Sequence, residues 1–126
     1  MKSALIIFLG AGIGGVIRHF FNVIVVGVTG VAFPWGIMTI NVIGCTLMGV
    51  VAGWLTMRGG SSQDLRLFLT TGVLGGFTTF SAFSLDTALL YERGMPGLAA
   101  VYVLASVILS LLGLFAGMWA MRAALG

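Results

Sequence analysis

The polar residues that interrupt the apolar segments of this chain are few, and the densest group lies near its middle. Gly75-Gly76 and Thr78-Thr79 stand in an otherwise apolar run. Glycine and threonine are poor helix formers, so we expect a helix to break here. Inside a bilayer, freed backbone groups must be satisfied by protein, an ion or a polar cavity. The interruption therefore predicts an ion or substrate site. Carbonyl dipoles without a nearby carboxylate suit a monovalent cation such as Na⁺, bound by the main chain at residues 75–78.

Single polar side chains on two other segments could also bind a ligand. Asn41 lies in the middle third of an apolar segment, where a buried amide needs partners. It could join two helices by a hydrogen bond, or it could present a donor to an anion. Tyr102, Ser106 and Ser110 are spaced i, i+4, i+8, which places three hydroxyls on one helix face. This stripe indicates either a polar track or contacts between helices.

Phe80 and Phe83 share one face of the helix expected after the interruption. Aromatic residues at this spacing are usually core residues or lipid-facing ones. A ring edge, however, carries positive potential, so it can contact a small anion without adding a full charge. Beside hydroxyl and amide donors, such edges favour weak binding at several sites, which permits conduction.

Several classes of function are disfavoured by the residue types that the apolar segments lack. No Asp, Glu or Lys lies in the middle of a segment, although a proton-coupled pump or a cation transporter usually needs one there. No metal-ligand cluster, nucleophile–base pair or phosphate loop is evident, so the sequence does not predict an enzyme. The net charge of +3 comes from basic residues scattered at segment ends, whereas a nucleic-acid binder would cluster them.

The composition places all of these residues in a membrane protein. Of the 126 residues, 60% are apolar and only 7% are charged, against about 25% charged residues in a soluble domain. Runs of about 20 apolar residues predict four spanning helices in a single domain, residues 1–126. The expected spans are residues 3–26, 34–57, 65–90 and 96–123. The predicted fold is an all-α membrane protein whose third helix is broken at the glycine-rich segment.

The distribution of charge bears on orientation. Four spans put the N-terminus, the second loop and the C-terminus on one side, which carries Lys2, Arg58, Arg66 and Arg122. Arg93 lies on the other side, so the positive-inside rule favours a cytoplasmic N-terminus by a small margin only. Because basic residues lie near both ends and the two sides differ little, we predict an antiparallel homodimer.

Pairs of glycines with GxxxG spacing let helix backbones approach closely in lipid. Three such pairs occur: Gly10 with Gly14, Gly49 with Gly53, and Gly113 with Gly117. Each pair is most simply a helix-packing site. Four short helices bury little surface by themselves, so the glycine-rich faces suggest a homo-oligomer.

Three motifs, taken in this order and spacing, resemble the CrcB family of Fluc-type fluoride channels along essentially the whole chain. Gly14-Gly15-Val16-Ile17-Arg18 looks like the first-helix pattern of the family, and Thr39-Ile40-Asn41-Val42-Ile43-Gly44 is similar to its asparagine motif. The third and most specific motif is GGFTTFSAFS, residues 75–84. Ala82 departs from the pattern, because the family commonly has a hydroxyl residue there.

The resemblance implies a fold, a function and a set of site residues. It implies passive export of cytoplasmic fluoride across the inner (plasma) membrane by a multi-pass channel, an antiparallel dual-topology homodimer of two four-helix subunits embedded in lipid. It also implies two fluoride pores and a structural Na⁺ on the dimer axis, held by the carbonyls of Gly75 and Thr78. The implied pore residues are Asn41, Phe80, Phe83, Ser81, Tyr102, Ser106, Ser110 and Arg18.

Two other readings fit parts of the sequence. A small multidrug-resistance exporter has four helices, dual topology and about this length, but such exporters rely on a glutamate in the first membrane helix, and the first span here has none. A membrane assembly subunit without transport activity would explain the glycine-rich faces but would leave the polar track unexplained.

Overall fold

The computed structural model describes all residues, 1–126, and every regular element in it is helical. The first two spans are α1 (Lys2–Thr29) and α2 (Trp35–Arg58), and the last is α6 (Pro96–Leu125). The third comprises α3 (Gln63–Arg66), the π-helical η1 (Leu67–Leu74), α4 (Gly75–Phe77) and α5 (Phe80–Glu92). Four helical segments are long and apolar enough to cross a membrane, and their ends lie within about three residues of those expected from the sequence.

The spans begin and end at residues suited to those positions. Ser62 caps α3, because its Oγ accepts a hydrogen bond of 3.1 Å from Leu65 N–H. Pro96 occupies the first turn of α6, where its missing N–H has no cost. Gly59 ends α2 with a φ of 57°, a left-handed conformation that glycine adopts without strain.

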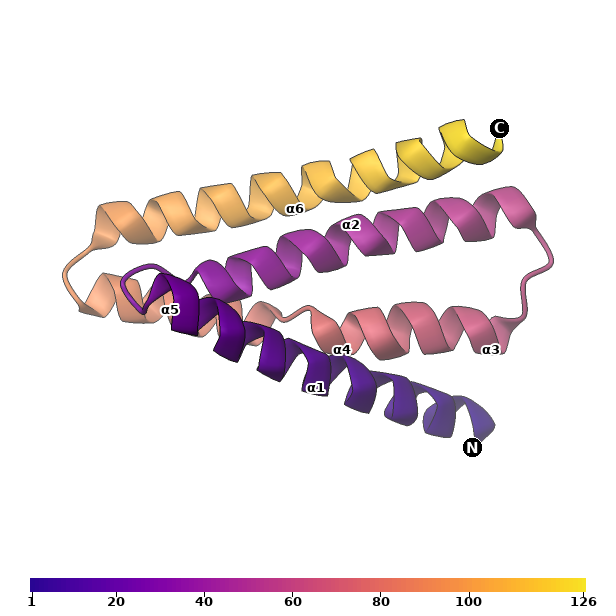
Figure 1. Cartoon of the computed structure of the whole chain (residues 1–126), viewed down its shortest axis with the longest axis horizontal. Helices are drawn as coiled ribbons and strands as arrows, with labels where there is room; N and C mark the ends of the chain where they lie inside the picture. The colour runs from indigo at the N-terminus through magenta and orange to yellow at the C-terminus, as the bar shows by residue number, and fades with distance from the viewer.

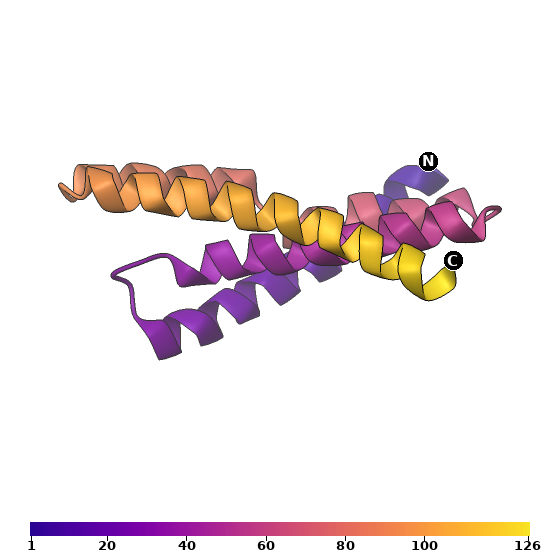
Figure 2. The ribbon, with the colours of Figure 1, turned by 90° about the horizontal axis from the view of Figure 1, so that it is seen from above.

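Both termini lie at the same end of the bundle as the connection between α2 and α3 (Figure 1). An exposed ion pair joins the start of α1 to α3 at this end, where Lys2 Nζ lies 2.8 Å from Asp64 Oδ2. The other two connections, α1 to α2 and α5 to α6, are both at the opposite end of the bundle, and a gap separates them in Figure 2. The predicted up-and-down order of the spans is therefore confirmed.

The glycine pairs pack helices of one chain against each other. A Cβ added to Gly49 would meet the backbone of Leu114, so α2 and α6 touch at main-chain distance. A Cβ on Gly10 would lie 2.8 Å from Phe68 O, which places η1 equally close to α1. The packing role predicted for these pairs is confirmed. Because the contacts are internal, however, the glycine faces no longer argue for an oligomer.

The third span leaves helical geometry at the threonines of the predicted interruption, and its glycines stay helical. Gly75 is helical, with φ −63° and ψ −37°. The extended residues are Thr78, with ψ 156°, and Thr79, with φ −152° and ψ 122°. The glycines instead allow close approach, since a Cβ on Gly76 would lie 2.5 Å from Ala11 O of α1. We call residues 78–79 the threonine segment.

The core is small and lies where α2, α5 and α6 meet. Its largest fully buried side chains are Tyr102, Ile40 and Leu90. Many large apolar side chains are exposed instead, such as Phe8 and Phe115. A soluble protein does not expose apolar surface on this scale, whereas a lipid-facing surface is apolar throughout.

Candidate functional site

Asn41 holds the threonine segment to α2 by two hydrogen bonds. Its Oδ1 accepts from Thr79 N–H at 2.8 Å, and its Nδ2 donates to Thr79 O at 3.0 Å. The amide thus replaces the helical partners that Thr79 gives up. A carboxamide nitrogen carries two hydrogens, so one remains for another acceptor. The two roles expected for Asn41, joining helices and presenting a donor, are therefore compatible in this geometry.

A cavity of about 310 Å³ opens beside the threonine segment. It is formed between α2, the start of α5 and the middle of α6. Its lining combines an amide, hydroxyls, a thiol and two phenyl rings with apolar side chains, but it contains no charged side chain. The lining residues are Asn41, Cys45, Thr78, Thr79, Phe80, Phe83, Ser106, Val107, Ser110 and Leu111.

The N-terminus of α5 meets this cavity at Thr79 and Phe80. Thr79 caps the helix, because its Oγ1 accepts a hydrogen bond of 3.1 Å from Ala82 N–H. Ser81 Oγ lies 3.2 Å from the same Thr79 hydroxyl. The first N–H groups of a helix carry partial positive charge and point outward along its axis, so this end of α5 favours an anion.

The two phenylalanines of α5 differ in their surroundings. Phe83 is 8% exposed and belongs to the core, whereas Phe80 is 78% exposed. Their ring centroids are 5.5 Å apart with an interplanar angle of 49°. Both rings line the cavity: the buried Phe83 forms part of its wall, and the exposed Phe80 lies on its open side.

The three hydroxyls predicted to form a track on α6 divide into two groups. Ser106 and Ser110 line the cavity. Ser106 is 4% exposed, and its Oγ is buried without a hydrogen-bond partner. A buried hydroxyl is normally paired, so an orphan one at a cavity indicates a ligand or water position. Tyr102 is fully buried beside the cavity, and its hydroxyl donates to Asp86 Oδ2 at 3.3 Å.

Arg18 reaches the other side of the threonine segment. Its Nη1 donates to Thr78 O at 3.3 Å, so its guanidinium is directed toward the break rather than toward a membrane surface. Arg18 does not line the cavity, and neither does Ser81. Ala82 also lies outside the lining and packs against the core.

Sequence reasoning missed two of the polar residues that line this cavity, Cys45 and Thr79. Cys45 lies one helical turn after Asn41, and that spacing could have placed its thiol on the same face. Thr79 both caps α5 and binds Asn41 through its backbone. A threonine directly before a renewed apolar run is an N-cap signal, so the cap was predictable from sequence.

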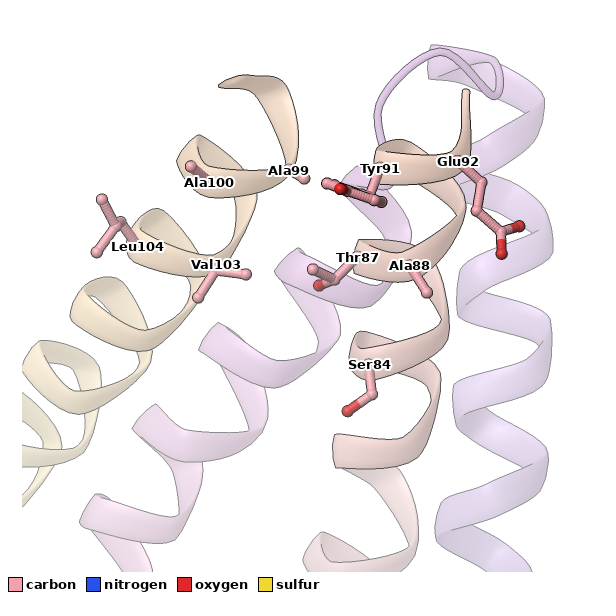
Figure 3. A pocket seen from close by; sticks show the side chains of 9 residues that line it. All are labelled: Ser84, Thr87, Ala88, Tyr91, Glu92, Ala99, Ala100, Val103 and Leu104. Carbon is pink, nitrogen blue, oxygen red and sulfur yellow. The ribbon is translucent and has the colours of Figure 1, made fainter. Parts of the chain in front are cut away.

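A larger groove, of about 680 Å³, lies elsewhere, between α5 and α6. Figure 3 shows Ser84 and Thr87 on α5 and Val103 on α6, all three of which line the groove. Both hydroxyls already donate to helical carbonyls, of Phe80 at 3.0 Å and of Phe83 at 2.9 Å. The groove therefore offers fewer free donors than the smaller cavity.

Fold and cavity together define a small multi-pass membrane protein with an uncharged cavity, lined by polar and apolar side chains, beside an interrupted helix. The sequence matches the family described as "CrcB-like protein, Camphor Resistance (CrcB)" over residues 5–118. The chain belongs to this family, as the three motifs indicated.

Close relatives are named as fluoride-specific ion channels. A protein of Rhodopseudomonas palustris (strain BisB5) is 58% identical over 94% of this chain and 96% of its own length, and one of Nitrobacter hamburgensis is 55% identical over 94% and 95%. A relative from Novosphingobium aromaticivorans is 51% identical over 97% of this chain and 98% of its own. The first and third are named "Fluoride-specific ion channel FluC" and the second "Fluoride-specific ion channel FluC 2". These are names of channels, in agreement with the prediction that the chain is not an enzyme.

Proposed function

We propose that this protein is a fluoride-selective channel that exports cytoplasmic fluoride passively across the inner (plasma) membrane. The observation that carries the proposal is the unpartnered Ser106 hydroxyl beside Asn41 in a cavity without carboxylates. The names of the close relatives supply the identity of the anion.

The cavity chemistry suits a small, strongly hydrated anion. Such an ion must exchange its water shell for several donors as it enters. Asn41 offers an amide hydrogen, Ser106 and Ser110 offer hydroxyls, and the start of α5 offers backbone N–H groups. The ring edges of Phe80 and Phe83 add weak positive potential. Because none of these groups is a full positive charge, each site binds weakly enough to release the ion again.

Purified protein in liposomes tests this proposal. Vesicles loaded with potassium fluoride are treated with valinomycin, and external fluoride is followed with an electrode. The proposal predicts rapid fluoride efflux and negligible chloride efflux under the same conditions. Equal fluxes of the two halides would contradict selectivity, and proton-driven export of an aromatic cation would favour the exporter reading.

We further propose that the functional unit is an antiparallel homodimer with two pores. In a single chain the cavity has an open side, and Phe80 on that side is 78% exposed. A second, inverted chain could close it. Single cysteines in each loop, in a chain whose Cys45 is replaced by Ser, test this arrangement in intact cells. Each loop is expected to be labelled from outside in about half of the molecules, and labelling of one loop in all molecules would refute antiparallel insertion.

We also propose that Na⁺ binds at the two-fold axis of this dimer through the carbonyls of Gly75 and Thr78. Gly75 O has lost its helical partner, because Thr79 N–H donates instead to Asn41. Thr78 O accepts a hydrogen bond of 3.3 Å from the Arg18 guanidinium, which would have to release this carbonyl for Na⁺ to bind. Neutral carbonyls suit a monovalent cation, which would hold the two interrupted helices together. Dialysis from sodium into N-methylglucamine is expected to lower the melting temperature of the dimer, and an unchanged temperature would contradict the site.

A further inference from the structure

A single thiol, that of Cys45, lies on the wall of the cavity beside the threonine segment. Cys45 follows Asn41 by one turn of α2, so the two side chains share one face of that helix. It is the only cysteine of the chain, it is half-buried, and it forms no disulfide. The donors that the proposed function assigns to the anion do not include this thiol, so its place in the cavity has no assigned role.

Cys45 marks the end of the cavity at which α2 and α6 converge. One turn beyond it, a Cβ added to Gly49 would meet the backbone of Leu114. A Cβ added to Gly113 would meet the hydroxyl of Thr46, the residue that follows Cys45. Because the two helices touch there, the space between them closes just beyond the thiol. A group attached to the sulfur would therefore lie in the narrow end of the cavity.

A second observation marks the same cavity as a place for a ligand. Ser106 is 4% exposed, and its Oγ has no hydrogen-bond partner although the residue lines the cavity. A buried polar atom is normally paired, so a ligand or a water molecule is expected beside it. Ser106 on α6 and Cys45 on α2 line one space, so a ligand that pairs with the serine occupies the space that the thiol borders.

The absence of charged side chains from the cavity determines which reagents can reach the thiol. Bringing a charged reagent into such a space costs free energy, because no opposite charge pairs with it there. A small neutral reagent avoids this cost. The chemical class that suits Cys45 is therefore a small, uncharged, thiol-reactive molecule such as methyl methanethiosulfonate.

We propose that Cys45 is a modification site on the anion pathway, at which a small neutral thiol reagent closes the channel. The inference rests on the proposed channel function, in which this cavity is part of the pathway. With methyl methanethiosulfonate, the Cys45 sulfur attacks the reagent sulfur that carries the methyl group. A disulfide to a methylthio group forms, the bond between the two reagent sulfurs breaks, methanesulfinate leaves, and the thiol proton passes to water.

Fluoride efflux from liposomes, measured before and after the reagent, tests the block. Treatment should lower the efflux by about tenfold or more, because the added group fills the narrow end of the pathway, and dithiothreitol should restore it. Cys45→Ser should keep its own untreated rate after the same treatment. Two exposed leucines provide matched positions for a new thiol in the Cys45→Ser chain. Leu111→Cys lines the cavity from α6 and should restore the block, whereas Leu47→Cys, on α2 but outside the lining, should not.

The mass of the intact protein follows the modification without any measurement of conduction. One methylthio group per chain is expected on the unsubstituted protein and none on Cys45→Ser. A thiosulfonate that carries a trimethylammonium group should modify Cys45 much more slowly than the neutral reagent, when each rate is divided by the rate with free cysteine. Should no fluoride flux be found in untreated protein, the channel function fails, but this preference still tests whether the thiol borders the uncharged cavity.

Three outcomes would overturn the inference. Complete modification of Cys45 with unchanged fluoride efflux would place the thiol outside the pathway. A block of Leu47→Cys as strong as that of Leu111→Cys would mean that the reagent disturbs the helices in general. Modification of Cys45 only after the protein is unfolded in detergent would mean that reagents do not reach the thiol through the cavity.

Discussion

Replacing Asn41 by Asp changes one donor into an acceptor while keeping the size of the side chain. The 2.8 Å hydrogen bond from Thr79 N–H survives, because a carboxylate oxygen accepts it. The 3.0 Å bond to Thr79 O is lost, and two oxygens face each other in its place. An unsatisfied carbonyl in this half-buried position costs about 1–3 kcal/mol of stability.

The effect on conduction is expected to be larger than the effect on stability. A carboxylate about 4 Å from a fluoride ion opposes it by roughly 4 kcal/mol at an effective dielectric constant of about 20. Each 1.4 kcal/mol corresponds to about a factor of ten, so fluoride occupancy beside the introduced carboxylate falls by about a thousandfold. We therefore expect Asn41→Asp to fold as a dimer and to conduct fluoride at about one thousandth of the normal rate at pH 8.

The liposome efflux assay measures this ratio, with size-exclusion chromatography as a check on folding. Gln63→Glu is the matched control, because it makes the same chemical change at an exposed position of α3. The control should conduct normally. Flux of Asn41→Asp within about threefold of the unmodified protein would refute the placement of Asn41 beside the ion.

Three further predictions test the walls of the cavity and the packing around it. Phe80→Ile and Phe83→Ile should both reduce fluoride efflux, but only Phe83→Ile should also lower stability, by about 1 kcal/mol, because Phe80 is exposed. Normal flux in both variants would mean that the two rings serve packing only. Ser106→Ala should reduce fluoride flux but leave the melting temperature unchanged or raise it, because the buried hydroxyl has no hydrogen-bond partner. A marked drop in melting temperature would mean that the hydroxyl is paired. Gly49→Val should destabilise the protein by about 1–3 kcal/mol, because the valine side chain would meet the backbone of α6. The control Gly12→Val faces open space and should leave stability unchanged, so equal melting temperatures of the two variants would contradict the α2–α6 packing.

Local signals in the sequence were sufficient to locate the four apolar helices and most of their ends. The apolar runs located four membrane helices, and Ser62 and Pro96 begin helices as their residue types predict. The glycine spacing identified close helix contacts but not their partners. Gly49 packs against α6 of its own chain, a fact that depends on tertiary arrangement.

Residue preferences alone predicted a break over both the glycine pair and the threonine pair and did not distinguish between them. Glycines are weak helix formers in isolation, yet Gly75 and Gly76 are helical here, and the lack of a side chain at Gly76 lets α1 approach closely. Thr79 leaves the helix because Asn41, 38 residues earlier in the chain, offers its backbone an alternative partner. Such a non-local partner has no local signature.

Helical spacing placed the hydroxyls of α6 on one face but did not determine what each one meets. Ser106 and Ser110 both line the cavity. The longer side chain of Tyr102 carries its hydroxyl to Asp86 instead, a residue that the sequence had not marked for any role. The partner of each hydroxyl depends on the length of its side chain and on the groups near its end, and sequence spacing does not report on those groups.

The reversal potential of single channels in a planar bilayer tests the central claim most directly. With a tenfold gradient of fluoride across the membrane and a constant high concentration of chloride on both sides, current carried by fluoride alone should reverse at the fluoride equilibrium potential. The account predicts this result for the purified protein. Reversal close to zero would mean that chloride passes as well, and it would contradict a cavity built to select fluoride.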